Sequence, residues 1–400
     1  MVDNDKKNLM LMVPMLHQGG FERVCVKTAF LMQEFYNVHI LIFSSRDINF
    51  DVTGLDVIDI DVPARDGILN KIINVFKRVN KTRKIKKDLG IDISYSFGSS
   101  ANYVNVLSRA GEKVLTGLRC QTDMENEKEV KLFCQRSDQV LSCSKEIVRQ
   151  LKRDFNYDKS TYIYNPLDIK DIEEKAKEDA EDFPFKNKGI VTIICSARND
   201  HIKGIWHLLK AFSIAATKAD NLRLVVIGAG NWDEYRKLSD KLGIADKVSF
   251  PGVKKNPFPY VAQSDIYVCS SNREGFPNAV LEGMALKKPV ICADCKTGPR
   301  EILLSENEYE DLITKRNDGS STACVIDGSY GILVPDMDDK ENLDPEYITG
   351  DEQVLSEQIV RLAMDKALRD KYSQRAYERA ASYSPDRYKD SIHEIFKRYE

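Results

Sequence analysis

Short apolar runs alternate with amphipathic stretches along the whole chain. In the first 145 residues, the runs LMLMVPML, NVHILIFSS and IDISYSF are separated by segments whose apolar residues recur with helical spacing. Continuous runs of this kind are typical of strands that are covered on both faces, as in parallel sheets connected by helices. The pattern predicts a parallel sheet wrapped by helices in the N-terminal part of the chain.

A second series of strands and helices follows an interruption. The periodicity lapses in the Pro-containing, charge-rich passage at 165–188, and new apolar runs then read IVTIICSAR, LRLVVIGAG, DIYVCSS, KPVICAD and GILVP. We therefore predict an α/β protein with two doubly wound domains, residues 1–165 and 166–382. Two such domains are expected to face each other across a central cleft, because open α/β sheets bind ligands at the carboxyl ends of their strands.

Composition and charge narrow the class of protein. The chain has 400 residues and a net charge of -3, so it lacks the basic excess of a nucleic-acid-binding protein. The apolar run from Leu9 to Leu16 is too short to span a bilayer and is not followed by a small-residue cleavage site. Nine scattered cysteines, mostly inside apolar runs, favour a reducing cytoplasm, and the pair Cys292 and Cys295 is interpreted as structural.

The first candidate for chemistry is the loop in SARNDHIKG. It follows a predicted strand, precedes a predicted helix and carries Arg198 and Lys203. Two cations beside the free N–H groups of a helix start make an anion site, whereas a solvated surface loop is the alternative.

The second candidate is the strand, loop and helix in DIYVCSSNREGFPNAVLEGMALKKPV. Pro277 and Asn278 suit the first turn of a helix, so the nearby N–H groups are expected to point toward the cleft. Glu274 lies before this turn and Glu282 lies one turn inside it. The two carboxylates are placed to flank a diphosphate and to accept hydrogen bonds from sugar hydroxyls.

These ordered motifs resemble those of retaining GT-B glycosyltransferases of the GT4 type, also called glycosyltransferase group 1. EGFPNAVLE is similar to the E-x7-E element of the family and ARNDHIKG to its Arg and Lys-Gly loop. IYNPLD looks like the end of the interdomain strand of the family, and GILVP looks like its late strand. HQGGFERV looks like its glycine-rich first loop. Gly298, Pro299, Arg300 and Glu301 are similar to members that build capsule, O-antigen or lipid-linked glycans from UDP-sugars.

The resemblance implies a GT-B fold of two Rossmann-like domains and a role for each candidate. Residues 1–165 would bind the acceptor, residues 166–382 the nucleotide sugar, and a helix at about 383–400 would pack back on the N-terminal domain. Arg198 and Lys203 would bind the donor diphosphate, and Glu282 would hold the ribose. Glu274 would contact the transferred sugar. The remaining donor-binding residues implied are Gly19, Gly20, Gly275, Phe276, Pro277 and Asn278.

The chain departs from the family in its N-terminal domain. Members often place a His near the reacting sugar, but the histidines here are at 17, 39, 201, 207 and 393. The corresponding region reads KVLTGLRCQTD, which makes Arg119 a candidate for contact with the sugar or acceptor, with a structural role as the alternative. His17 beside the glycine loop is the other candidate, again with a structural alternative.

Two further motifs are interpreted as imitations of other sites. VVIGAGNWDE has Asp233 in place of the third glycine of a dinucleotide fingerprint, which favours a plain loop over NAD binding. DMD at 336–338 lies in an acid-rich passage, and the family resemblance implies transfer without a metal. We expect neither a metal nor a cofactor, with a UDP-sugar as co-substrate.

A basic amphipathic segment suggests which surface of the protein faces the acceptor. In residues 68–90, Ile68, Ile72, Phe76 and Val79 form one helical stripe, and eight Lys or Arg with no acid lie between 71 and 87. Such a helix fits an anionic membrane surface, whereas a solvated outer helix is the alternative. The candidates for contact with the membrane are Lys71, Lys77, Arg78 and Lys81.

The sequence thus predicts a retaining, metal-independent glycosyltransferase that uses a nucleotide sugar, a UDP-sugar by expectation. Its acceptor would be a glycan or a lipid-linked glycan in cell-surface polysaccharide synthesis. The enzyme would be cytoplasmic and peripheral on the inner face of the cell membrane. The alternatives are a nucleotide-sugar epimerase of GT-B architecture and a non-catalytic nucleotide-binding subunit.

Overall fold

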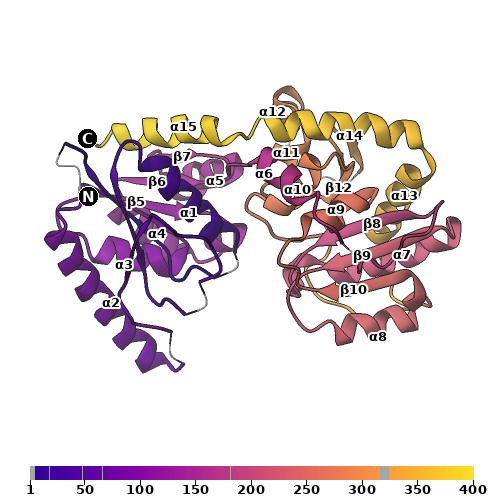
Figure 1. Cartoon of the computed structure of the whole chain (residues 1–400), viewed down its shortest axis with the longest axis horizontal. Helices are drawn as coiled ribbons and strands as arrows, with labels where there is room; N and C mark the ends of the chain where they lie inside the picture. Colours follow the sequence, from indigo (N-terminus) through magenta and orange to yellow (C-terminus); the bar gives the residue numbers. More distant parts are fainter. Residues whose placement is uncertain (1–4, 18, 47, 65, 181, 316–323) are drawn as a thin grey trace. The chain divides into compact units, whose positions relative to one another are not determined.

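The chain folds into two compact units, which are described separately. The structure, a computed structural model, describes residues 5–17, 19–46, 48–64, 66–180, 182–315 and 324–400. Unit 1 comprises Met1–Pro166 and Pro385–Glu400, and unit 2 comprises Leu167–Ser384 (Figure 1). The sequence predicts divisions at 165/166 and about 382/383, one and two residues earlier.

Unit 1 is built on a seven-stranded parallel sheet in the order β3-β2-β1-β4-β5-β6-β7. The strand order reverses next to β1, as in a doubly wound fold. Its strands are β1 (Asn8–Met12), β2 (Asn37–Ile42), β3 (Asp56–Asp59), β4 (Ile93–Phe97), β5 (Lys113–Leu118), β6 (Gln139–Ser142) and β7 (Ser160–Tyr162). The central strands β1 and β4 are almost fully buried, in agreement with their continuous apolar runs.

Helices cover this sheet, and the last of them comes from the end of the chain. They are α1 (Gly20–Met32), α2 (Ile68–Asp88), α3 (Ser99–Leu107), α4 (Glu127–Arg136), α5 (Lys145–Phe155) and α15 (Pro385–Lys397). The hydroxyl groups of Tyr388 in α15 and Thr28 in α1 are 2.7 Å apart, and Ile392 and Phe396 join the core of unit 1. The C-terminal helix is therefore an integral part of the N-terminal unit.

Unit 2 repeats the architecture with the strand order β10-β9-β8-β11-β12-β14-β13, in which only β13 is antiparallel to its neighbour. The strands are β8 (Val191–Ser196), β9 (Leu222–Ile227), β10 (Val248–Gly252), β11 (Ile266–Cys269), β12 (Val290–Ala293), β13 (Ile326–Asp327) and β14 (Ile332–Val334). The helices are α6 (Ile169–Lys175), α7 (Ile205–Lys218), α8 (Asp233–Lys241), α9 (Phe258–Gln263), α10 (Asn278–Ala285), α11 (Pro299–Leu303), α12 (Glu306–Lys315), α13 (Gly350–Met364) and α14 (Lys366–Ala381).

The order of strands in unit 2 decides where its loops meet. β8 and β11 are parallel neighbours, with Ile193 opposite Ile266 and Ile194 opposite Tyr267. The carboxyl ends of parallel neighbours lie at one edge of the sheet. The loop after β8, which carries Arg198 and Lys203, is therefore brought against the loop after β11, which carries Glu274.

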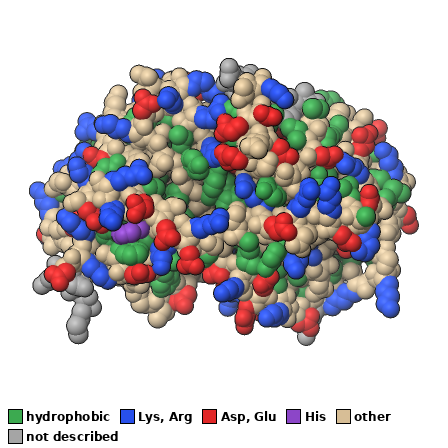
Figure 2. Space-filling model, turned by 90° about the horizontal axis from the view of Figure 1, so that it is seen from above, with side chains coloured by type: hydrophobic (Ala, Val, Ile, Leu, Met, Phe, Trp, Pro, Cys, Tyr) green, Lys and Arg blue, Asp and Glu red, His purple; other side chains and the backbone are tan. Residues whose placement is uncertain are grey.

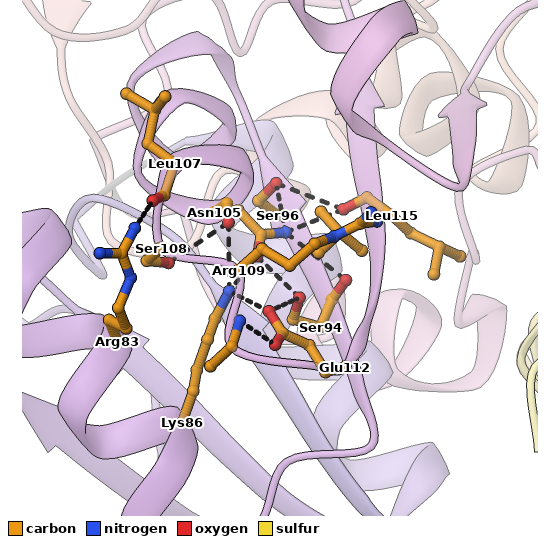
Figure 3. Close-up of polar contacts among 12 residues, drawn as sticks. Arg83, Lys86, Ser94, Ser96, Asn105, Leu107, Ser108, Arg109, Glu112 and Leu115 are labelled. Atoms are coloured by element: carbon orange, nitrogen blue, oxygen red, sulfur yellow. Dashed lines mark hydrogen bonds and ion pairs between the residues drawn. The ribbon is translucent and has the colours of Figure 1, made fainter.

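Unit 1 also contains a buried polar network, which fixes α2 to α3 and β5 (Figure 3). The Lys86 ammonium lies 2.6 Å from Glu112 Oε1 and 2.8 Å from Asn105 Oδ1, and the Ser94 hydroxyl donates to the same Asn105 oxygen at 2.7 Å. Burial lowers the pKa of Lys86 to about 8, although the Glu112 carboxylate acts in the opposite direction. The inner side of α2 is thus held by polar bonds as well as by the apolar packing of Val79 and Ile85.

The surface carries charges of both signs. Figure 2 shows a face on which Lys and Arg side chains are interspersed with Asp and Glu side chains. Among the described residues, no helix combines the length and apolar character needed to cross a membrane.

Candidate functional site

Two loops of unit 2 are bonded to each other at the carboxyl edge of its sheet. The Ser270 hydroxyl donates to the carbonyl of Lys203 at 3.1 Å, and the backbone N–H of Asn272 donates to the carbonyl of Ile202 at 2.9 Å. These bonds join residues 198–204, which follow β8, to residues 270–277, which follow β11. Both predicted donor loops therefore belong to one local structure.

At the centre of this structure, Lys203 and Glu274 form an ion pair. The Lys203 ammonium nitrogen is 2.8 Å from Glu274 Oε1, and the side chains are 19% and 13% exposed. A charge this far removed from water is costly unless an opposite charge accompanies it. The pair is thus a mostly desolvated cation and anion that solvent or a ligand still reaches.

Arg198 occupies the same loop but has a different partner. Its side chain is 63% exposed, and its Nε and Nη2 atoms donate to Asp200 Oδ2 at 3.2 and 3.0 Å. Asp200 in turn caps the turn His201–Lys203 by accepting the N–H of Ile202. Exposed pairs of this kind contribute little stability, about 0–1 kcal/mol, so Arg198 is easily released toward a ligand.

The second loop leads into α10 as the sequence predicts. Pro277 is the N-cap residue and Asn278 the first helical residue, while Glu282 lies one turn inside and is partly exposed. Phe276 is buried, and its ring packs edge-on against Tyr383 at a centroid distance of 5.4 Å. The Phe276 side chain therefore fixes the loop, and its backbone is the part placed for a ligand.

Glycines allow the loops of the site to approach one another. Gly298 has φ = 94°, and a Cβ there would lie 2.6 Å from Pro277 Cδ and 2.9 Å from the Gly275 carbonyl oxygen. In the GAG motif, a Cβ on Gly228 would lie 1.9 Å from the carbonyl oxygen of Ala197. The motif that imitates a dinucleotide fingerprint thus permits the close approach of the loop that carries Arg198.

The cysteines near the site are buried. Burial raises the pKa of the Cys195, Cys292 and Cys295 thiols, whereas a hydrogen bond with Cys292 lowers the pKa of Cys269. Every cysteine of the chain is free. Within the described ranges, no group of three or more His, Cys, Asp or Glu side chains is arranged to hold a metal ion.

The N-terminal candidates belong to unit 1. His17 is exposed in the loop between β1 and α1, where Gly19 is the N-cap residue and Gly20 the first residue of α1. Gly19 is extended, and a Cβ there would lie 1.9 Å from Glu22 Oε2. The carboxylate of Glu22 thus occupies the space that a side chain at position 19 would take.

Arg119 requires a correction. It is buried in unit 1, where its Nη1 donates to the Tyr95 hydroxyl at 3.0 Å and its Nη2 donates to Asn165 Oδ1. Its guanidinium also lies over the Phe97 ring, 5.5 Å from the centroid. The structural role that the sequence left open fits these contacts, and a contact with sugar or acceptor does not.

Two residues near the ion pair were missed. The Nδ2 of Asn272 donates to the carbonyl oxygens of Met337 and Asp338 at 2.9 and 2.8 Å, and the Thr297 hydroxyl donates to the Glu274 carbonyl. Asn272 ties the loop to Met337 and Asp338, and Thr297 holds the loop from outside it. Polar loop residues show no periodicity, so no local signal could have identified them.

Comparisons with known proteins agree with this architecture. Residues 176–327 match the family model described as glycosyl transferases group 1. The chain is 28% identical over 332 residues to the N-acetylgalactosamine-N,N'-diacetylbacillosaminyl-diphospho-undecaprenol 4-alpha-N-acetylgalactosaminyltransferase of Campylobacter jejuni, covering 78% of this chain and 88% of that one. It is 31% identical over 231 residues to an uncharacterized glycosyltransferase of Methanocaldococcus jannaschii, covering 56% of this chain and 54% of the relative.

Solved structures share the fold over nearly the whole chain. Anabaena HepE in complex with UDP superposes with a TM-score of 0.71 at 16% identity, covering 98% of this chain and 99% of that chain. At this low sequence identity, the structural similarity shows only that the fold is shared. It confirms the GT-B fold of two Rossmann-like domains that the sequence predicts.

Replacing Gly298 by Ala is expected to destabilise unit 2. The new Cβ would meet Pro277 and Gly275 in a backbone conformation that side chains rarely adopt, at a cost of about 1–3 kcal/mol. Urea unfolding measures the effect. Gly350→Ala is the control, because Gly350 begins α13 with open space around its Cβ position and should tolerate Ala. Equal stability of the two variants would contradict the close packing of the site.

Proposed function

We propose, from the premise that this chain is a glycosyltransferase of group 1, that it transfers a sugar from a UDP-sugar to a glycan or lipid-linked acceptor with retention of configuration. The observation that carries the proposal is the Lys203–Glu274 pair, held 2.8 Å apart beside the start of α10. A cation, a carboxylate and the N–H groups of a helix start are the three kinds of group that we propose a nucleotide sugar contacts here.

We match each part of the donor to a protein group of complementary charge or hydrogen-bonding capacity. The diphosphate would take the ammonium of Lys203, the guanidinium of Arg198 and the N–H groups at the start of α10. The carboxylate of Glu274, once displaced from Lys203, would accept hydrogen bonds from hydroxyls of the transferred sugar. Glu282 would accept them from the ribose, because carboxylates are strong acceptors for paired hydroxyls.

The reaction proposed needs no base from the protein. The acceptor oxygen forms a bond to the anomeric carbon on the face that the nucleotide leaves, and the bond from that carbon to the phosphate oxygen breaks. The acceptor proton passes to the departing phosphate. Lys203 and Arg198 offset the negative charge that grows on the diphosphate, and we propose that they do so without a metal ion.

The acceptor class is inferred from the relatives. The Campylobacter relative is named for transfer to a sugar carried on diphospho-undecaprenol, which is a lipid-linked acceptor. We propose an acceptor of the same class for this chain, met at the cytoplasmic face of the cell membrane. The transferred hexose or N-acetylhexosamine would be set by the hydroxyl contacts of Glu274.

UDP is expected to raise the melting temperature of the protein more than GDP or ADP does, because a ligand of the folded state stabilises it. In Glu282→Ala the shift with UDP should fall, since the ribose contact is lost. Glu357→Ala, an exposed carboxylate in α13, is the matched control and should keep the shift. A thermal-shift titration measures all three proteins, and no shift with any nucleotide would overturn the donor assignment.

The helix α2 supports the membrane part of the proposal, after a correction. Arg78 donates from Nε and Nη2 to the carbonyl of Val62 at 3.0 and 2.8 Å, and Lys81 donates to the carbonyl of Ile60 at 2.6 Å. These two predicted membrane contacts instead bind the segment that follows β3. Lys71 and Lys77 are exposed.

The apolar stripe also requires a correction. Val79 is buried, whereas Ile72 and Phe76 are 50% and 66% exposed, and the neighbouring Ile73 is 49% exposed. The side chain of Ile68 lies outside the described residues. The predicted stripe is therefore divided, because Ile72 and Phe76 face outward as expected whereas Val79 packs inward.

Part of the polarity of α2 differs from that of an ordinary surface helix. Asn74, Thr82 and Lys86 are buried on its inner side beside Val79, and Asn74 donates to the Pro63 carbonyl at 2.8 Å. The outer side presents Ile72, Ile73 and Phe76 near the start of the helix, with Lys77 next to Phe76 in the sequence and Lys84 further along the helix. Large apolar side chains that face water next to cations fit a surface with an apolar interior and anionic groups.

We therefore propose that the outer side of α2 docks on anionic phospholipid. The apolar residues would enter the boundary between headgroups and acyl chains, and the lysines would meet the phosphates, each contributing on the order of 1 kcal/mol. No acid lies between residues 71 and 87 to oppose this attraction.

The protein is expected to sediment with phosphatidylglycerol vesicles at low salt and less so at high salt, which screens the lysines. The triple variant I72S/I73S/F76S should bind at least about tenfold less, because apolar burial is lost. Met364→Ser, which changes an exposed apolar residue of unit 2, is the control and should bind as the unchanged protein does. Binding that the triple substitution leaves unchanged would refute α2 as the docking surface.

A further inference from the structure

His207 lies one turn into α7, directly behind the loop that carries Lys203. It is buried, and it lines a cavity of about 330 Å³ together with Asp338 and Glu352. Neither Lys203 nor Glu274 lines this cavity. His207 is therefore outside the candidate donor site, and the sequence analysis gave it no role.

Both ring nitrogens of His207 face hydrogen-bond acceptors. Nδ1 is 2.7 Å from Glu352 Oε1, and Nε2 is 2.7 Å from the carbonyl oxygen of Asp338. A carbonyl oxygen can only accept, so Nε2 carries a proton and donates it to Asp338. Glu352 is itself fixed, because its other oxygen accepts the N–H of Thr349 in the capping box of α13.

The Asp338 carbonyl joins His207 to the donor loop. The same oxygen accepts a second hydrogen bond, from Asn272 Nδ2 at 2.8 Å. Asn272 stands two residues before Glu274, and its backbone N–H binds the carbonyl of Ile202, next to Lys203. A continuous series of hydrogen bonds thus runs from Glu352 through His207 and the Asp338 carbonyl to Asn272. Asn272 lies in the loop that carries Glu274 and is bonded to the loop that carries Lys203.

The loops have little freedom to accommodate a shift of Asn272. A Cβ on Gly204 would lie 2.9 Å from Asn272 Oδ1 and 2.2 Å from the Ser270 carbonyl oxygen. Gly204 is thus in close contact with both groups, and closely packed groups tend to transmit a displacement. A displacement of the Asp338 carbonyl would therefore reach both the Lys203 loop and the Glu274 loop.

We propose that His207 is a positioning residue of the donor site, which holds Asn272 through the Asp338 carbonyl and so fixes the spacing of Lys203 and Glu274. The proposal rests on the donor assignment for its effect on nucleotide binding. Its structural part, the order of the 270–276 loop, stands without that assignment.

Two substitutions separate the two bonds of the ring. The amide nitrogen of Gln can replace Nε2 and keep the bond to Asp338, whereas that of Asn reaches only the place of Nδ1 and keeps the bond to Glu352. If His207 acts through Asp338, His207→Gln retains the order of the loop and His207→Asn loses it. If His207 only stabilises the fold through Glu352, the loop is at least as ordered in His207→Asn as in His207→Gln.

A control acts on the same segment at another point. The Tyr235 hydroxyl donates to Glu341 Oε1 at 2.6 Å, which anchors the stretch after Asp338 without touching Asn272. Tyr235→Phe removes this bond and leaves the path through His207 intact.

Amide hydrogen exchange measures the loop directly. The exchange of the Asn272 amide should be about tenfold faster in His207→Asn, as expected for the loss of one hydrogen bond, and nearly unchanged in His207→Gln and Tyr235→Phe. Equal exchange in the Asn and Gln variants would overturn the proposal.

Titration with UDP gives the functional outcome. UDP affinity is expected to follow the same ranking, with a loss in His207→Asn of about tenfold or less. Failure of the unchanged protein to bind UDP would refute the donor assignment and leave the exchange result to decide the role of His207. Binding of UDP with equal affinity by all three variants would refute the positioning role alone.

Discussion

The ion pair between Lys203 and Glu274 is the interaction on which the candidate site depends. It joins residues 71 positions apart, from loops that follow two neighbouring strands of one sheet. Each charge is largely removed from water and would be costly alone, so each requires the other when no ligand is present. The positive-φ glycine at 298, the buried Phe276 ring and the bonds of Asn272 all act to hold this pair in place.

Under the proposed function, the pair also gives a physical reason for reactivity. A diphosphate carries more charge than one carboxylate, so it would draw the ammonium of Lys203 away from Glu274. The freed carboxylate would then accept hydrogen bonds from hydroxyls of the sugar. Binding energy would thereby be used to arrange the groups around the reacting carbon, which is how an enzyme favours the transition state over the bound substrate.

The sequence was sufficient for the fold and for the local motifs, because these follow from contiguous residues. The apolar runs LMLMVPML and IVTIICSAR became β1 and β8, and EGFPNAVLE became the loop and helix around Pro277. Contacts between distant residues were not predictable. Arg119 is buried by Tyr95 and Asn165, and Lys86 and Asn74 of α2 find polar partners within unit 1. Neither set of contacts has a signal in the local pattern.

A double-mutant cycle on UDP affinity tests the central claim most directly, with Lys203→Met, Glu274→Gln and the double variant titrated by calorimetry. Competition between Glu274 and the diphosphate for Lys203 predicts that Lys203→Met weakens UDP binding by at least about tenfold. Glu274→Gln alone should strengthen UDP binding, because it removes the carboxylate that competes for Lys203, and it should have no effect when Lys203 is already replaced. A coupling energy of zero, with the two effects simply additive, would contradict the account.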